Sequence, residues 1–212
     1  MGEINLGDEN VSGYLALPGS GEDPGVMVLH AWWGLNNVFK QFCQRLAAEG
    51  FVAFAPDLYH GAVATTINEA EQLSSNLNHQ IATREIIAAL EYLRRRSGNS
   101  LGVVGSSLGA FLALRLAQNQ PEQVAAAVLF YGTGDGQYDK TRAAFPGHFA
   151  ENDPYEPSEV VQQLESSLRA AGRQVTFHTY PGTGRWFFEP DRPEAAQLAW
   201  ERTVKFLHEH LD

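Results

Sequence analysis

The sequence predicts an α/β fold in which a mostly parallel, twisted sheet of about seven to eight strands has helices on both faces. Apolar runs alternate with amphipathic helical patterns along the whole chain, which is typical of this class. Several runs are continuously apolar, as strands buried on both faces are. No repeat, linker or low-complexity stretch interrupts the 212 residues, so we expect one domain over residues 1–212.

The expected elements follow one another in order. Residues 4–6 and 11–17 predict an antiparallel hairpin at the edge of the sheet. Asn36 or Asn37 can cap a helix that runs to residue 48 and ends before Gly50. Further strands are expected at residues 26–29, 51–55, 101–104, 124–130, 143–149 and 175–180, and further helices at residues 68–76, 83–96, 110–118, 157–171 and 193–210.

Composition argues against several classes of partner. The net charge of −10 disfavours nucleic acid, which requires a basic face. No apolar run approaches the roughly 20 residues of a membrane span, and the residues after Met1 lack the basic and apolar segments of a signal peptide. Cys43 is the single cysteine, which fits a reducing compartment. We expect a cytoplasmic monomer or homodimer that binds neither nucleic acid nor membrane.

One pentapeptide carries the strongest chemical signal. Gly105-Ser106-Ser107-Leu108-Gly109 joins a predicted strand to a predicted helix, the context that a G-x-S-x-G nucleophile elbow requires. The turn lifts the Ser107 hydroxyl above the sheet, and the glycines let strand and helix approach closely. The alternative is an ordinary glycine-rich turn with Ser107 as an N-cap. No group of His, Cys, Asp and Glu has metal-ligand spacing, so we expect no metal and no other cofactor.

Together with this elbow, five further segments make the chain resemble the dienelactone hydrolase family over nearly its whole length. The resemblance implies an α/β-hydrolase fold. Each segment falls at a predicted strand end or in the turn that follows, where ligands bind in open α/β sheets. These segments are Leu29-His30-Ala31-Trp32-Trp33-Gly34-Leu35-Asn36, Pro56-Asp57-Leu58-Tyr59, Phe130-Tyr131-Gly132, Gly147-His148-Phe149-Ala150-Glu151-Asn152-Asp153 and Tyr180-Pro181-Gly182-Thr183-Gly184-Arg185-Trp186-Phe187-Phe188.

The resemblance implies a role for each matching residue. Ser107 stands at the nucleophile position, where the family usually has cysteine, and Asp153 matches the family's acid. Trp32 and Leu108 match the residues whose backbone N–H groups form the oxyanion hole. Arg185 stands where the family has its catalytic histidine.

Arg185 is the main departure from the family pattern. An arginine stays protonated, so it cannot accept the proton of Ser107. We expect its guanidinium to form a bidentate ion pair with Asp153 instead. Ala31 replaces an acidic residue of the founding enzymes, and the arginines that hold the dienelactone carboxylate lack clear counterparts, so dienelactone itself is not the expected substrate. Another histidine, His30 or His60, remains an alternative base.

Aromatic residues at the predicted strand ends indicate an apolar cleft beside Ser107. Trp33, Tyr131, Trp186 and Phe187 are the expected lining, although Phe187 can equally be a core residue. Such a cleft suits a small-molecule ester or lactone. The sequence therefore predicts a hydrolase of small esters or lactones that acts through a Ser107 acyl-enzyme and is impaired by Arg185. The alternative is a catalytically silent protein of the same fold that binds a small ligand or a partner.

Overall fold

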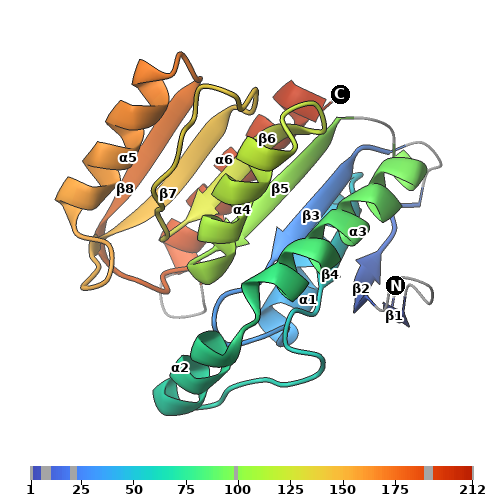
Figure 1. Ribbon diagram of the computed structural model, residues 1–212. Helices are drawn as coiled ribbons and strands as arrows, with labels where there is room; N and C mark the ends of the chain where they lie inside the picture. Colours follow the sequence, from blue (N-terminus) through green and yellow to red (C-terminus); the bar gives the residue numbers. More distant parts are fainter. Residues whose placement is uncertain (1, 6–10, 20–22, 98–99, 189–192, 212) are drawn as a thin grey trace. The chain divides into compact units, whose positions relative to one another are not determined.

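A computed structural model describes residues 2–5, 11–19, 23–97, 100–188 and 193–211. Within these residues the chain forms eight strands and six helices (Figure 1). The chain divides into two compact units, Met1–Leu101 and Gly102–Asp212, which are described separately below. The expected α/β class is confirmed by the alternation of strands and helices. The expectation of a single domain stays a prediction.

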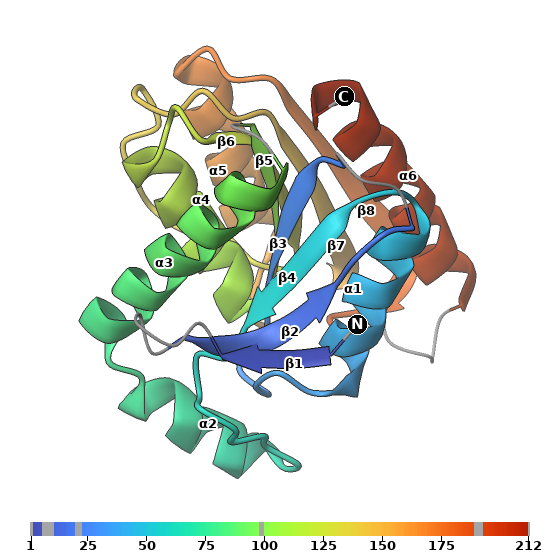
Figure 2. The same cartoon turned by 90° about the vertical axis from the view of Figure 1, so that its right-hand side faces the viewer.

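The first unit contains four strands in the order β1-β2-β4-β3 (Figure 2). β1 pairs antiparallel with β2, and β2 pairs antiparallel with β4, whereas β3 and β4 are parallel. The predicted edge hairpin is confirmed, with Glu3 opposite Tyr14, although Leu6 lies outside the described residues. The strands are β1 (Gly2–Asn5), β2 (Ser12–Ala16), β3 (Gly25–Leu29) and β4 (Val52–Pro56).

Helices cover both faces of these strands. α1 (Asn37–Ala48) packs on β2 and β4, and α3 (His79–Ser97) packs on β3 and β4 from the opposite face (Figure 2). The short α2 (Ile67–Asn76) precedes α3. α3 begins earlier than expected at residue 83, because the Asn78 side chain caps it by accepting from the backbone of Gln80 and Ile81.

α1 follows the rules that its sequence suggests. The Asn36 side chain accepts from the Val38 backbone N–H at 3.0 Å, so Asn36 is the N-cap. Phe39, Phe42, Cys43 and Leu46 recur at helical spacing and are buried. Cys43 is fully buried, and this burial raises the pKa of its thiol.

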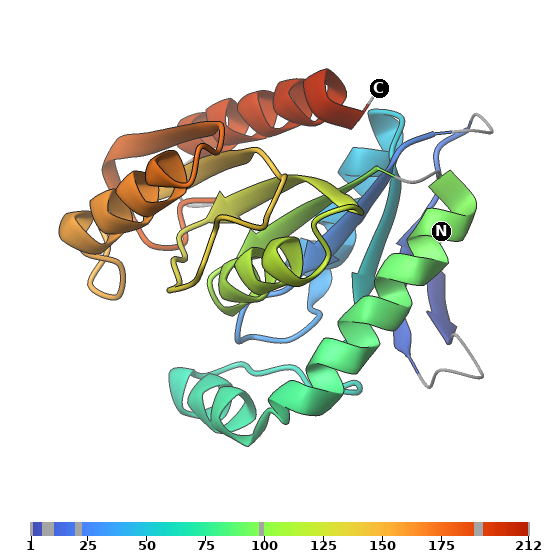
Figure 3. The ribbon, with the colours of Figure 1, turned by 45° about the horizontal axis from the view of Figure 1, so that its top comes forward.

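The second unit contains the strands β5-β6-β7-β8 in that order. β7 is parallel to both β6 and β8. Figure 3 shows α4 and α5 on one face of these strands and α6 on the other. The elements are β5 (Leu101–Ser106), α4 (Leu108–Asn119), β6 (Val124–Phe130), β7 (Phe145–Asn152), α5 (Ser158–Ala170), β8 (Val175–Gly184) and α6 (Pro193–Leu211).

β7 and β8 extend past their predicted ends at residues 149 and 180. Their ladder shifts register after Ala150 and continues to the pair Asn152 and Gly184. The Glu151 carboxylate also accepts from the Gly182 backbone N–H at 2.9 Å, which ties the extensions together. As a result, Asp153 and Arg185 each follow directly on the end of a paired strand. No described helix is long and apolar enough to span a membrane.

Candidate active site

Ser107 occupies a strained turn between β5 and α4. Its φ and ψ are 54° and −115°, in a region that residues other than glycine rarely adopt. Its backbone N–H donates to the Phe130 carbonyl at 2.9 Å. Although Ser107 sits at the N-cap position, its hydroxyl makes no capping bond. Leu108 begins α4, so its N–H has no partner within the helix.

Two glycines allow the tight contacts around this turn. A Cβ at Gly105 would collide with the Gly109 carbonyl and lie 2.7 Å from the Ala110 nitrogen. A Cβ at Gly132 would lie 2.6 Å from the backbone carbonyl oxygen of Ser107. Both distances are too short for real carbon contacts, so strand, turn and helix approach closely only because these positions lack side chains.

Arg185 bridges the acid and the serine. Its Nη1 donates to both carboxylate oxygens of Asp153, each at 2.9 Å, and its Nη2 donates to Ser107 Oγ at 2.8 Å. The ion pair is expected from sequence, but its bidentate form is not found. Both Asp153 oxygens share one nitrogen because the second nitrogen is directed at Ser107. The two side chains are only 9% and 2% exposed, so this is a buried ion pair.

Asp153 is held by its own loop. Its Oδ1 accepts from the backbone N–H groups of Tyr155 and Glu156 at 2.9 and 3.2 Å. The ring of Tyr155 lies 4.9 Å from the Arg185 guanidinium carbon, and that of Tyr131 lies 6.0 Å away. These contacts fix the guanidinium plane between a carboxylate and the serine hydroxyl.

A second carboxylate beside Arg185 was not anticipated from the sequence. Glu156 Oε1 lies 3.9 Å from Arg185 Nη2. Thr133 holds Glu156 by donating from its hydroxyl at 2.5 Å and from its backbone N–H at 3.3 Å. Burial raises the pKa of Glu156, an effect opposed by the Thr133 hydrogen bonds and by Arg185. In the sequence, Glu156 is marked only by its position three residues after Asp153, and this position does not determine the direction of its side chain.

The predicted aromatic residues of the second unit take different positions. Phe187 is 2% exposed and packs on Tyr180 and Tyr131, with ring centroids 4.7 and 5.9 Å apart, so it lies in the core. Tyr131 is also buried, whereas Trp186 is half-buried. A role for Tyr131, Trp186 and Phe187 in binding substrate stays a prediction.

His148 forms part of a buried network that joins β7, β8 and α6. Thr203 donates its hydroxyl proton to the Ala199 carbonyl at 2.8 Å, so it must accept from His148 Nε2 at 3.1 Å. His148 Nδ1 then accepts from the Tyr180 hydroxyl at 2.7 Å. Burial is the main cause that lowers the pKa of His148 to about 3. Both ring nitrogens are therefore occupied, and the neutral imidazole is structural.

The remaining candidate residues belong to the first unit. His30 is fully buried, with Nδ1 on the Ala31 carbonyl at 2.7 Å and Nε2 accepting from the Leu58 N–H at 3.2 Å. Burial lowers the pKa of His30. Trp32 and Trp33 form an edge-to-face pair with ring centroids 5.8 Å apart. Their predicted roles at the oxyanion hole and in the pocket stay predictions.

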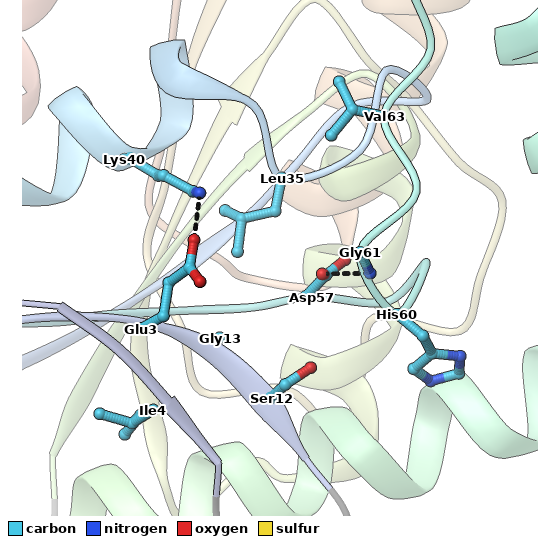
Figure 4. Close-up of a pocket in the computed structure, with 10 residues that line it drawn as sticks. All are labelled: Glu3, Ile4, Ser12, Gly13, Leu35, Lys40, Asp57, His60, Gly61 and Val63. Atoms are coloured by element: carbon cyan, nitrogen blue, oxygen red, sulfur yellow. Dashed lines mark hydrogen bonds and ion pairs between the residues drawn. The ribbon is translucent and has the colours of Figure 1, made fainter.

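His60 lies at the margin of a cavity of about 370 Å³ within the first unit (Figure 4). Its Nε2 bonds Glu85 Oε1 at 2.7 Å. In the cavity, Lys40 and Glu3 point toward one another and pair at 2.6 Å. The Asp57 carboxylate accepts from the backbone of Tyr59 and Gly61. The charges of this cavity are thus paired with one another or with the backbone.

Among the side chains that the structure describes, no group of three or more His, Cys, Asp or Glu residues could hold a metal ion. The candidate site of the second unit thus contains the Ser107 hydroxyl at a strained turn and the Arg185 guanidinium, which donates to that hydroxyl. Two carboxylates, Asp153 and Glu156, lie beside the guanidinium.

Known proteins resemble this chain along nearly its whole length. A model of the dienelactone hydrolase family matches residues 11–211. Protein usf of Aquifex pyrophilus is 33% identical, and the alignment covers 100% of this chain and 98% of that protein. A protein of Aquifex aeolicus (strain VF5) named "Putative carboxymethylenebutenolidase" is 31% identical with the same coverage.

A solved structure extends the comparison to the fold. A crystal structure from Klebsiella pneumoniae subsp. pneumoniae, described as "Putative Dienelactone Hydrolase", has a TM-score of 0.87 at 24% identity, covering 99% of this chain and 98% of that chain. This likeness confirms the α/β-hydrolase fold. Since the family match spans almost every residue, the chain belongs to the dienelactone hydrolase family, a family of hydrolases.

Proposed function

We propose that this protein hydrolyses small carboxylic esters or lactones through an acyl-enzyme on Ser107, and that Arg185 makes its turnover slow. One observation carries the proposal: Ser107 Oγ stands at a strained elbow and accepts from Arg185 Nη2 at 2.8 Å, while Nη1 of the same guanidinium binds Asp153. The arginine thus spans the serine and the acid as a histidine would in a catalytic triad.

The chemistry follows from what each group can do. Ser107 Oγ attacks the carbonyl carbon, and the N–H of Leu108 at the start of α4 stabilises the oxyanion. Arg185 stabilises negative charge on Oγ, but it cannot take the proton away. In a serine hydrolase, losing the histidine lowers kcat by roughly 10⁶, with a remainder of roughly 10³ to 10⁴ over water from the oxyanion hole.

The test places an imidazole at position 185. Hydrolysis of para-nitrophenyl acetate is measured for the native chain, Ser107→Ala and Arg185→His. We expect Arg185→His to raise kcat by about 10²-fold or more, because an imidazole held by Asp153 can accept the proton. Ser107→Ala should abolish activity above water. Arg142→His, at an exposed arginine paired with Glu122, is the matched control and should change nothing.

A second candidate function is a catalytically silent protein that binds a small ligand or a partner. The buried ion pair between Arg185 and Asp153 favours it, since the pair holds the loops while consuming the acid. A fluorophosphonate label separates the two functions. Labelling of Ser107 supports the hydrolase, whereas absent labelling, together with no gain from Arg185→His, establishes the silent protein.

A further inference from the structure

Glu156 is a half-buried carboxylate beside Arg185, the residue that donates to the Ser107 hydroxyl. Its side chain is 14% exposed, and its Oε1 and Ser107 Oγ both neighbour a single nitrogen, Arg185 Nη2, at 3.9 and 2.8 Å. Oγ receives a hydrogen bond from that nitrogen, so its own proton remains to be donated elsewhere.

The segment Gly132–Thr133 also links Glu156 to the turn that carries Ser107. Gly132 packs so tightly on the turn that a Cβ there would lie 3.1 Å from the Ser107 Cα. The next residue, Thr133, donates its backbone N–H to Glu156 Oε1. The oxygen that faces Arg185 is thus anchored one residue from the segment that touches Ser107.

The geometry points to Glu156 as the base that accepts the proton of Ser107 Oγ, directly or through one water, an inference that rests on the hydrolase function proposed above. Asp153 cannot do so while both its oxygens are held by Arg185 and its own loop. Glu156 Oε2 bonds the Thr133 hydroxyl. Among the described residues, Oε1 has the 3.3 Å bond from the Thr133 N–H and the 3.9 Å approach of Arg185 Nη2.

The proton balance closes over both half-reactions. In acylation the bond from Oγ to the carbonyl carbon forms, the Oγ proton passes to Oε1, and the carbonyl electron pair moves to oxygen. Collapse of this intermediate breaks the bond to the leaving alcohol, which takes the proton from Glu156. In deacylation a water attacks the acyl carbon, gives a proton to Glu156, and Ser107 recovers it as the acid leaves.

The electrostatic setting suits a base. Burial raises the pKa of Glu156 and so strengthens it as a proton acceptor, in the same direction as the nearby Asp153 charge. The Thr133 hydrogen bonds and the Arg185 charge act in the opposite direction and favour the ionised form. On the acidic side, kcat/KM should therefore fall at a pH above the ordinary pKa of a glutamate. This fall is called the acid limb below.

The experiment compares pH profiles of kcat/KM for para-nitrophenyl acetate from about pH 4 to about pH 8. The variants are Glu156→Gln, Thr133→Val, Ser107→Ala and the control Glu159→Gln, an exposed residue of α5. We expect Glu156→Gln to lower kcat by about 10²-fold and to remove the acid limb. Thr133→Val removes a hydrogen bond to the ionised form, so the limb should move to higher pH.

A double substitution separates a base from a structural residue. In the Arg185→His background the imidazole takes the proton, so adding Glu156→Gln should lower kcat far less than it does in the native chain. If Glu156→Gln keeps both the rate and the limb while Ser107→Ala abolishes activity, the inference is overturned and the hydrolase stands. If Ser107→Ala stays as active as the native chain, the proposed function itself fails. Equal losses in both backgrounds would assign Glu156 a structural role and reject the base.

Discussion

At Arg185 a single planar cation faces three acceptors: Asp153, Ser107 and Glu156. The guanidinium donates from two different nitrogens, one to a carboxylate and one to a hydroxyl, whereas a lysine ammonium donates from a single nitrogen. The side chain is 9% exposed, so little water shields it. Its stability in that position depends on the carboxylates, and above all on Asp153.

Removing the Asp153 charge should therefore destabilise the fold. Asp153→Asn leaves a buried guanidinium without its main counter-charge, which costs about 3 kcal/mol. Urea unfolding at neutral pH measures the loss. Glu122→Gln, at the exposed pair with Arg142, is the control and should cost less than about 1 kcal/mol. Equal losses in the two variants would contradict the importance assigned to the buried pair.

Among the elements, the turn from β5 to α4 concentrates backbone constraint. Ser107 adopts φ 54°, and Gly105 supplies the space in which strand and helix meet. The N–H of Ser107 and the carbonyl of Phe130 link this turn to the end of β6. The strained residue persists because its neighbours on both sides are fixed.

The turn should not tolerate a methyl group at Gly105. Gly105→Ala places a Cβ against the Gly109 and Ala110 backbone, which must shift at a cost of about 1–3 kcal/mol. Thermal unfolding followed by circular dichroism detects the change as a lower Tm. Gly19→Ala, where an added Cβ meets nothing within 4 Å, serves as the control. An unchanged Tm for Gly105→Ala would refute this account of the elbow.

The sequence predicted these elements well where burial decides them. β3 is a continuous apolar run, and all five of its residues are buried. It predicted the strand ends poorly, because Pro181 and Gly182 suggest a turn whereas the ladder of β7 and β8 continues past a register shift. The start of α3 was missed because the cap at Asn78 precedes the apolar periodicity.

The candidate site was predicted to a similar extent. The elbow motif indicated Ser107, and the resemblance to the dienelactone hydrolase family indicated Asp153 and Arg185. The hydrogen bond from Arg185 to Ser107 did not follow, because the direction of a long side chain depends on packing that no local pattern encodes. Glu156 was missed for the same reason, since its direction is set by Thr133, 23 residues away.

For the whole molecule, buried histidines determine how folding responds to acid. The pKa of His148 is lowered to about 3, and that of His30 is lowered as well, in both cases mainly by burial. An unfolded histidine takes up a proton near pH 6.5. For His148, between about pH 6.5 and about pH 3, the unfolded chain binds more protons than the folded chain, so stability falls as the pH falls.

This linkage gives a slope that can be measured. His148 removes about 1.4 kcal/mol of stability per pH unit below about pH 6.5, and its loss continues to about pH 3. Urea unfolding at several pH values should give a shallower slope for His148→Gln, whose amide can still bond Tyr180 and Thr203. His79→Gln, at an exposed position, should keep the native slope. A steeper dependence of stability on pH for His148→Gln would contradict the linkage assigned to His148.

The burial of Cys43 has a practical consequence for the first unit. A thiol that is fully buried and held protonated cannot react with an alkylating reagent until α1 opens. Because it is the chain's single cysteine, the rate of its modification in the native protein reports every opening that exposes α1. Thiol labelling by mass spectrometry can therefore follow local opening around α1 without any introduced probe, while substitutions are made at the serine in the other unit.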